Sequence, residues 1–220
     1  MNYSKYPDIE AVLIRAKEQL NKIENAYGDA LQSKSIPNEL LVDIKDYLGN
    51  VRSALDYLAC KIQSKNAYFP VANSVTDFTA RVQDFPKNTI SILEGVQSYK
   101  SDNWLSNFSL LSNKNKHVTL IPQTRTEIKE TRITGPGGKV SWGPGVTFGS
   151  GVSVMGVQID PITQLPVQNN VVRTEIITWV HFIFDNSDFQ NLPDNISALP
   201  FLKETFQKVV KIIKDIEDLL

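Results

Sequence analysis

Hydrophobic residues recur every three or four positions in a first long stretch near the N-terminus. This spacing places apolar side chains on one face of a helix and leaves lysines and glutamates on the other. Pro7 and Asp8 are typical of a first turn, and the pattern fades between Gly28 and Gln32, so we predict one helix between these limits. The apolar positions are Ile9, Val12, Leu13, Ala16, Leu20, Ile23 and Tyr27.

A second stretch of the same period runs from Leu40 to Ile62. Ser35 and Pro37 offer a cap and a first-turn proline for it. The connection between the two stretches is short, and we therefore predict two long helices packed antiparallel. The expected buried stripe of the second helix is Leu41, Ile44, Leu48, Val51, Leu55, Leu58 and Ile62.

The middle of the chain breaks this regularity. Pro70 lies within residues 67–71 and disfavours helical angles in the residue before it. We therefore expect an extended segment there. Shorter helices follow: one capped by Ser74 or Thr76 and stopped by Pro86, one over residues 90–96, and one from Trp104 to about 112–113.

From His117 to about Phe184 the period changes to two. Glycine-rich turns at 135–138, 143–145 and 149–151 separate the apolar runs, which predicts an antiparallel meander of short strands. The last run, 171–184, is apolar on both faces. We therefore expect it to be a central strand with a helical layer over one side.

A closing helix is predicted from Pro200, because apolar residues again step by three and four to the end of the chain. The fold class expected is α+β: a helical bundle with an antiparallel sheet inserted before the last helix. We expect one domain over residues 1–220, with a helical part at 1–116, a sheet at 117–186, and a closing segment with its helix at 187–220 packing on the helical part.

Composition narrows the functional classes. With 23 basic and 24 acidic residues in 220, the net charge of -1 lacks the basic excess typical of non-specific nucleic-acid binding. The chain has no apolar signal core and no run of about 20 apolar residues, so we expect a cytoplasmic protein without a membrane partner. One cysteine excludes an intramolecular disulfide. The chain has two histidines and no metal-ligand or cofactor motif. We therefore expect no metal site and no cofactor.

Arg52 and Asp56 are the first candidates for chemistry. They lie four residues apart beside the apolar stripe of the second helix. The simplest interpretation is an intrahelical ion pair. The alternative is a binding site, because a charged pair that is partly removed from water often marks one.

A second candidate group lies between the helix predicted from Trp104 and the predicted sheet: Asn115, Lys116 and His117. Local polarity is expected of any turn, but loop residues also present side chains to ligands. If Lys116 and His117 approach Arg52, three cationic groups would hold a phosphate or a carboxylate. The aromatic residues Trp142, Phe148 and Trp179 could stack bases, although core packing is the commoner role at strand spacing.

Three short blocks in order resemble a group of poorly characterised bacterial and phage proteins. They are Val51-Arg52-Ser53-Ala54-Leu55-Asp56-Tyr57-Leu58-Ala59, then Tyr68-Phe69-Pro70, then Leu110-Leu111-Ser112-Asn113-Lys114-Asn115-Lys116-His117. The resemblance covers about residues 40–120. That group in turn resembles the HEPN superfamily of helical bundles.

The HEPN resemblance implies specific roles for a few residues. Ribonucleases of that superfamily carry an arginine and, four to six residues later, a histidine, which together assist attack of a ribose 2'-hydroxyl on the phosphate without a metal. Arg52 matches the arginine, but Tyr57 stands where the histidine is expected. A tyrosine, with an ordinary pKa near 10, is a poor proton shuttle at neutral pH. Either catalysis is lost, or His117 supplies the imidazole ring that acts as the proton shuttle.

Three functional hypotheses follow. The first is a HEPN-like module, non-catalytic or weakly catalytic, that binds a nucleotide or RNA phosphate with Arg52, Asp56, Tyr57, Asn115, Lys116 and His117, in phage defence or counter-defence. The second is an interaction or structural component that docks a protein partner or a second copy. The third is a metal-independent ribonuclease with Arg52 and His117 as catalytic residues.

Overall fold

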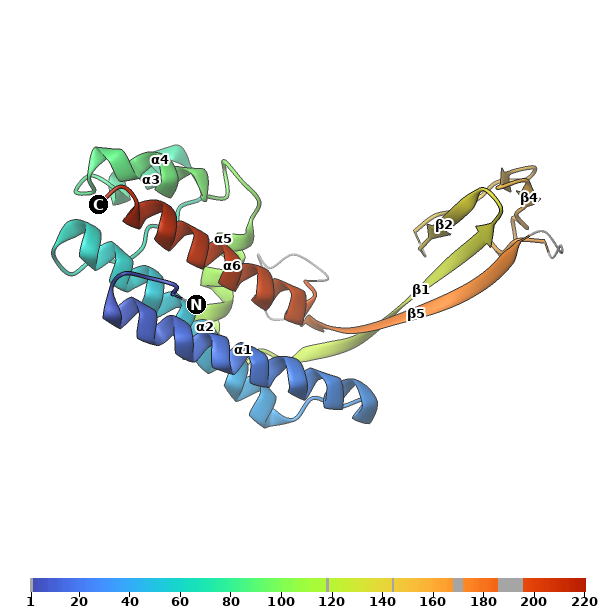
Figure 1. Ribbon diagram of the computed structural model, residues 1–220, viewed down its shortest axis with the longest axis horizontal. Coiled ribbons are helices and arrows are strands. Elements are labelled where there is room, and N and C mark those ends of the chain that lie inside the picture. The colour runs from blue at the N-terminus through green and yellow to red at the C-terminus, as the bar shows by residue number, and fades with distance from the viewer. Residues whose placement is uncertain (1, 118, 144, 168–171, 186–195) are drawn as a thin grey trace. The chain divides into compact units, whose positions relative to one another are not determined.

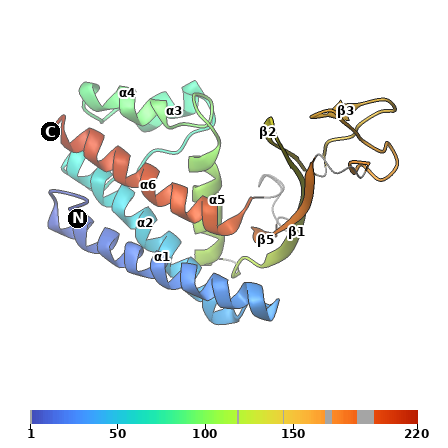
Figure 2. The same cartoon turned by 45° about the vertical axis from the view of Figure 1, so that its right-hand side comes forward.

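A computed structural model describes residues 2–117, 119–143, 145–167, 172–185 and 196–220. Six helices and five strands lie within these ranges, and they confirm the α+β class (Figures 1 and 2). The helices are α1 Pro7–Ser33, α2 Asn38–Gln63, α3 Val75–Arg81, α4 Lys87–Gly95, α5 Trp104–His117 and α6 Ala198–Glu217. The strands are β1 Gln123–Gly135, β2 Gly138–Trp142, β3 Ser153–Val154, β4 Val157–Gln158 and β5 Arg173–Phe184.

Contacts divide the chain into two compact units. The helical unit comprises Met1–Thr124 with Phe182–Leu220, and the β unit comprises Arg125–His181. Such a division does not test whether either unit folds alone, so the single domain over 1–220 stays a prediction.

The core of the helical unit is built on the α1–α2 pair, with α6 packed against both helices (Figure 2). This confirms the predicted pair and the return of the last helix. The buried hydrophobic residues of α1 are spaced alternately by four and three positions, which keeps them on one stripe that faces the partner helix. They are Ile9, Leu13, Ala16, Leu20, Ile23, Tyr27 and Ala30. Across the bundle, the buried hydroxyl of Tyr47 donates to the carbonyl oxygen of Leu202 at 2.7 Å, and burial raises the pKa of this phenol.

The structure differs from the prediction in two details of α2. Pro37 is the cap residue of α2 and makes no side-chain cap bond, so Ser35 does not cap this helix. Leu40 is buried where Leu41 was expected, whereas the other six residues of the predicted stripe are buried as expected. For α3, the structure confirms the first of the two predicted caps: Ser74 accepts from the backbone N–H of Asp77 at 3.2 Å.

The prediction that the helix beginning at Trp104 ends near 112–113 is wrong. Helix α5 continues to His117, which places Asn115, Lys116 and His117 in its last turn, not in a loop or at the start of a strand. The first strand, β1, begins only at Gln123. The polar composition of residues 112–117 favoured a turn, but packing against α2 keeps the helix intact.

The main sheet has three strands in the order β2-β1-β5, and β3 and β4 form a separate antiparallel pair. Strands β1 and β2 form an antiparallel hairpin in which Gly135 faces Gly138, and Gly138 adopts a φ of 124°. Such an angle is readily reached only by glycine. The expectation that the last strand is central is wrong, because β5 stands at the end of this order and β1 in its middle. The apolar run of β5 is partly open to water, with Ile176 58% exposed.

The β unit has a small core. Its buried cluster consists of Ile133, Trp142 and Ile159. Phe148 packs edge-to-face on Trp142 with ring centroids 5.1 Å apart, which favours the packing role of these two aromatic residues. The side chain of Trp179 lies outside the described residues.

Replacing a residue at the α1–α2 seam tests this core. Leu55 is fully buried, and Leu55→Ala is expected to lower the free energy of unfolding by about 3 kcal/mol because it leaves a cavity. Val42 on the same helix is 41% exposed, and Val42→Ala should change stability by less than about 0.5 kcal/mol. Urea denaturation compares them, and equal losses would contradict the assignment of the seam.

Candidate functional site

Arg52 and Asp56 form a two-point ion pair on α2. Nε of Arg52 lies 3.2 Å from one carboxylate oxygen of Asp56, and Nη2 lies 3.0 Å from the other. The two side chains are only 12% and 23% exposed. Spacing of four residues on a helix allows the contact, and the planar guanidinium matches both oxygens. The pair is therefore more buried than the simple surface ion pair that the spacing indicates.

Both members of the pair also hold the backbone of Phe69. Nη2 of Arg52 donates to the carbonyl oxygen of Phe69 at 3.2 Å, and the N–H of Phe69 donates to Asp56 at 2.9 Å. Phe69 is buried, so its peptide groups would otherwise lose their hydrogen bonds to water. We call this arrangement of Arg52, Asp56 and the Phe69 backbone the clamp. It joins the first two sequence blocks that carry the HEPN resemblance.

A second set of bonds continues the clamp along the chain. The buried amide of Gln97 donates to the carbonyl oxygens of Pro70 and Leu93, and accepts from the N–H of Ala72 at 2.8 Å. The extended segment after α2 is thus fixed on one side to α2 and on the other to the end of α4. Gln97 was not among the predicted site residues, because nothing in the neighbouring sequence distinguishes it from a surface glutamine.

One nitrogen of the clamp has no partner among the described residues. Nη1 of Arg52 is shielded from solvent and makes no hydrogen bond with the described part of the chain. A guanidinium stays charged at any physiological pH, so a buried N–H group without an acceptor is costly. Such a group in a folded protein calls for an explanation, for example an anion or a water molecule.

Asn115 has a structural task at the end of α5. Its amide donates to the carbonyl oxygen of Leu111 at 3.0 Å and accepts from the N–H of Ile121 at 3.1 Å. The residue is buried, and these bonds fix the path of the chain as it leaves the helix.

Lys116 and His117 belong to the last turn of α5, which packs against α2. Their side chains lie outside the described residues. The gathering of these two side chains around Arg52 therefore stays a prediction.

Tyr57 lies on a different face of α2 from Arg52, because five residues turn a helix by about 140° beyond a full circle. The ring is 42% exposed and lines a shallow pocket of about 270 Å³ with Asp8 and Lys61. The Lys61 ammonium, 2.9 Å from Asp8, lowers the pKa of that carboxyl group through their hydrogen bond. Tyr57 is thus not part of the clamp.

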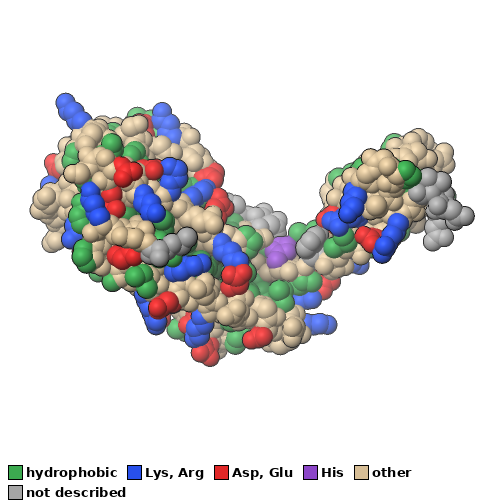
Figure 3. Space-filling model, viewed as in Figure 1, with side chains coloured by type: hydrophobic (Ala, Val, Ile, Leu, Met, Phe, Trp, Pro, Cys, Tyr) green, Lys and Arg blue, Asp and Glu red, His purple; other side chains and the backbone are tan. Residues whose placement is uncertain are grey.

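Other kinds of site find little support. Within the described ranges, no three His, Cys, Asp or Glu side chains gather as ligands for a metal ion. None of the helices found there is long and apolar enough to cross a membrane. On the face shown in Figure 3, acidic and basic side chains are interspersed over the helical unit.

Comparison with known proteins gave no match to a family model, to a curated protein or to a solved structure.

The clamp predicts a large cost for neutralising Asp56. Asp56→Asn leaves the mostly buried Arg52 charge without its counter-ion and is expected to lower the free energy of unfolding by about 3 kcal/mol. The matched control is Asp77→Asn on α3, which breaks an Arg–Asp pair at the same spacing whose side chains are 52% and 42% exposed. Its cost should not exceed about 1 kcal/mol. Chemical denaturation measures both, and similar values would argue against a structural clamp.

Proposed function

We propose that the helical unit is a HEPN-like module, non-catalytic or weakly catalytic, that binds the phosphate of a nucleotide or RNA beside Arg52. The unpartnered, buried Nη1 of Arg52 is the observation that carries this proposal. A phosphate oxygen is the acceptor that a guanidinium N–H binds best, because the bond is charge-assisted.

The other contacts of Arg52 favour a prepared anion site. Asp56 and the carbonyl of Phe69 fix the guanidinium plane, so little side-chain entropy is lost when Nη1 gains a partner. Asp56 already balances the Arg52 charge, so a phosphate needs further cations. Lys116 and His117 in the last turn of α5 are the residues that we assign to this role. Because Nη1 is shielded from solvent, phosphate entry requires neighbouring side chains to move aside.

The absence of efficient catalysis follows from Tyr57. It occupies the position at which the HEPN resemblance expects a histidine, and its side chain leaves α2 on another face than Arg52. The protein therefore recognises a phosphate without a proton shuttle beside the arginine. Its assignment to phage defence or counter-defence depends on the resemblance alone.

Ligand-dependent unfolding tests the phosphate site. ATP or a short RNA at one hundred times its dissociation constant should stabilise the protein by about 2.7 kcal/mol, which raises Tm by roughly 5–10 °C for a chain of this size. Arg52→Lys should remove this shift, and Arg81→Lys on α3 is the control. Labelled RNA incubated in EDTA should stay largely intact.

If neither ATP, RNA nor inorganic phosphate raises Tm at millimolar concentration, the phosphate site is refuted. An equal ligand-induced shift in the Arg52 and Arg81 variants would place the binding elsewhere.

A second candidate function is self-association through the β unit. This unit spans 57 residues, yet it carries seven of the fourteen large hydrophobic side chains that are exposed in the described part of the chain. They are Ile128, Val140, Val146, Val152, Ile162, Val167 and Ile176. A unit with so small a buried cluster gains little from its own burial, and exposed apolar surface of this density marks interaction sites.

The charges on β5 favour a second copy as the partner. Arg173 and Glu175 project from one face of β5 and form an ion pair at 2.8 Å. When two β5 strands pair antiparallel about Thr174, each Arg173 faces the Glu175 of the other copy, an arrangement that stabilises a strand pair by about 0.2–1 kcal/mol. An edge strand such as β5 also offers backbone groups for this pairing.

Light scattering coupled to gel filtration tests this association. The full chain is expected to elute at twice the monomer mass at micromolar concentration, and Ile176→Lys should convert it to the monomer by placing a charge on β5. Val75→Lys, at a side chain of similar exposure (56%) on α3, should stay dimeric. A wild-type protein that is monomeric throughout this range would exclude the second copy.

A further inference from the structure

Two aromatic rings are exposed in the described part of the chain, and both lie next to the clamp. Tyr57 follows Asp56 on α2, and Tyr68 precedes Phe69 in the extended segment after α2. Because the N–H of Phe69 donates to Asp56 at 2.9 Å, the two tyrosines flank one hydrogen bond of the clamp. The exposed fractions are 42% for Tyr57 and 83% for Tyr68. A side chain that keeps so much of its surface in water adds little to the core, so packing does not explain Tyr68.

The backbone that carries the Tyr68 ring is fixed on both sides. The Cys60 thiol donates to the carbonyl oxygen of Ala67 at 3.3 Å and accepts from the N–H of the same residue at 3.4 Å. On the other side, the clamp holds both peptide groups of Phe69. A ligand that contacts the ring therefore meets a backbone that is already ordered, which lowers the entropy cost of binding.

The surface around Tyr68 is polar. No other large hydrophobic side chain between residues 58 and 74 is exposed, whereas Ser64, Lys65 and Asn66 are exposed. Surfaces that dock proteins instead carry contiguous apolar patches. Separate aromatic rings among polar and charged side chains are typical of surfaces on which the bases of a single-stranded nucleic acid stack.

Tyr57 lines a shallow pocket of about 270 Å³ whose charges are balanced. Lys61 in the lining binds Asp8 at 2.9 Å, and Lys65 binds Asp84 at 2.7 Å. Two ammonium groups and two carboxylates leave no net charge among these four residues. Such a pocket favours a flat, uncharged group such as a nucleobase over an ion, and the phosphate of the same strand is left to the clamp.

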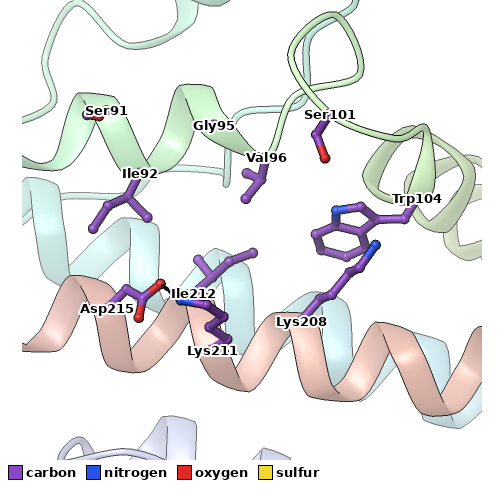
Figure 4. Close-up of a pocket in the computed structure, with 10 residues that line it drawn as sticks. All are labelled: Ser91, Ile92, Gly95, Val96, Ser101, Trp104, Lys208, Lys211, Ile212 and Asp215. Carbon is purple, nitrogen blue, oxygen red and sulfur yellow. Dashed lines mark hydrogen bonds and ion pairs between the residues drawn. The ribbon is translucent and has the colours of Figure 1, made fainter.

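The cavity between α4 and α6 offers no comparable ring (Figure 4). Trp104 lines this cavity, but the residue is only 6% exposed, and the Lys208 ammonium lies 5.3 Å from the ring centroid. Lys208 in turn binds Asp102 at 2.6 Å and Glu204 at 2.8 Å. A base would reach the ring only after these groups moved, so Trp104 is not a stacking surface.

We propose that the phosphate at the clamp belongs to a single strand of RNA and that bases of this strand stack on Tyr68 and Tyr57. The proposal rests on the phosphate site at Arg52 and adds the class of its ligand. A mononucleotide has one base, whereas a strand offers a base to each ring. The lysines beside the rings are paired and the net charge is -1, so we expect stacking to supply more of the affinity than phosphate neutralisation does.

Fluorescence anisotropy of the full chain with a labelled eight-nucleotide oligoadenylate tests the stacking. A strand of the same length with abasic riboses keeps the phosphates and is the reference. The wild type should bind the oligoadenylate at least about tenfold more tightly than the abasic strand, because each stacked base adds to the affinity. Tyr68→Ala should weaken oligoadenylate binding at least about fivefold without weakening the abasic strand, and Tyr68→Phe, which keeps the ring, should restore most of the affinity.

A second ring and a surface control complete the set of variants. Tyr57→Ala should weaken oligoadenylate binding in the same way as Tyr68→Ala. Val75→Ala should leave the affinity for both strands unchanged, because Val75 is an exposed aliphatic residue of α3 (56%) that offers no ring.

Arg52→Lys separates this proposal from the phosphate site. If Arg52→Lys weakens the binding of both strands while Tyr68→Ala changes neither, the phosphate site stands and the stacking is overturned. If Tyr68→Ala weakens the oligoadenylate while Arg52→Lys changes neither strand, the stacking stands and the phosphate site at Arg52 is wrong. Equal affinity of the wild type for the two strands, or no binding of either strand, would also overturn the stacking.

Discussion

The largely buried ion pair between Arg52 and Asp56 determines how the middle of the chain joins the long helices. It holds both peptide groups of Phe69, and Gln97 then ties Pro70 and Ala72 to the end of α4. Helix α4 also forms one wall of a cavity that Trp104 and residues of α6 line. The clamp is thus linked to α4 by these hydrogen bonds and by the backbone between Phe69 and Ala72. Loss of Asp56 would loosen that path as well as remove one charge.

The helices could be predicted because their apolar residues repeat with the helical period and bury against one another. Seven positions of α1 follow that rule, and the ends of α1 and α6 were located within a few residues. The end of α5 was missed because the polar residues at 112–117 carry no periodic signal, and only packing on α2 keeps them helical. The place of β5 was missed for another reason. A strand that is apolar on both faces is usually central in a large sheet. Here the sheet has three strands in the described structure, β5 lies at its edge, and part of the apolar surface of β5 is exposed to solvent.

At the candidate site, spacing alone identified the Arg52–Asp56 pair but not its task. The contact partners of a charged pair come from segments distant in sequence, here Phe69, and no local pattern marks a backbone group as a partner. The role of Asn115 could not be predicted for the same reason. Its hydrogen bonds to Leu111 and Ile121 depend on the path of the chain after α5. The Trp104 cavity joins three elements separated by up to about 120 residues, which periodicity cannot bring together.

The charge of Arg52 is the part of the clamp that a structural task does not explain. Gln97 shows that a neutral amide holds two backbone groups of the same extended segment, Pro70 and Ala72, without burying a charge. A buried ion pair costs several kcal/mol in desolvation, and apolar residues of similar size are often as stable in its place. A clamp built only for stability would therefore not need a guanidinium, and still less one with a nitrogen that lacks an acceptor. A permanent positive charge, fixed in one plane and with both N–H groups of Nη1 unused among the described residues, is the feature on which the proposed anion site depends.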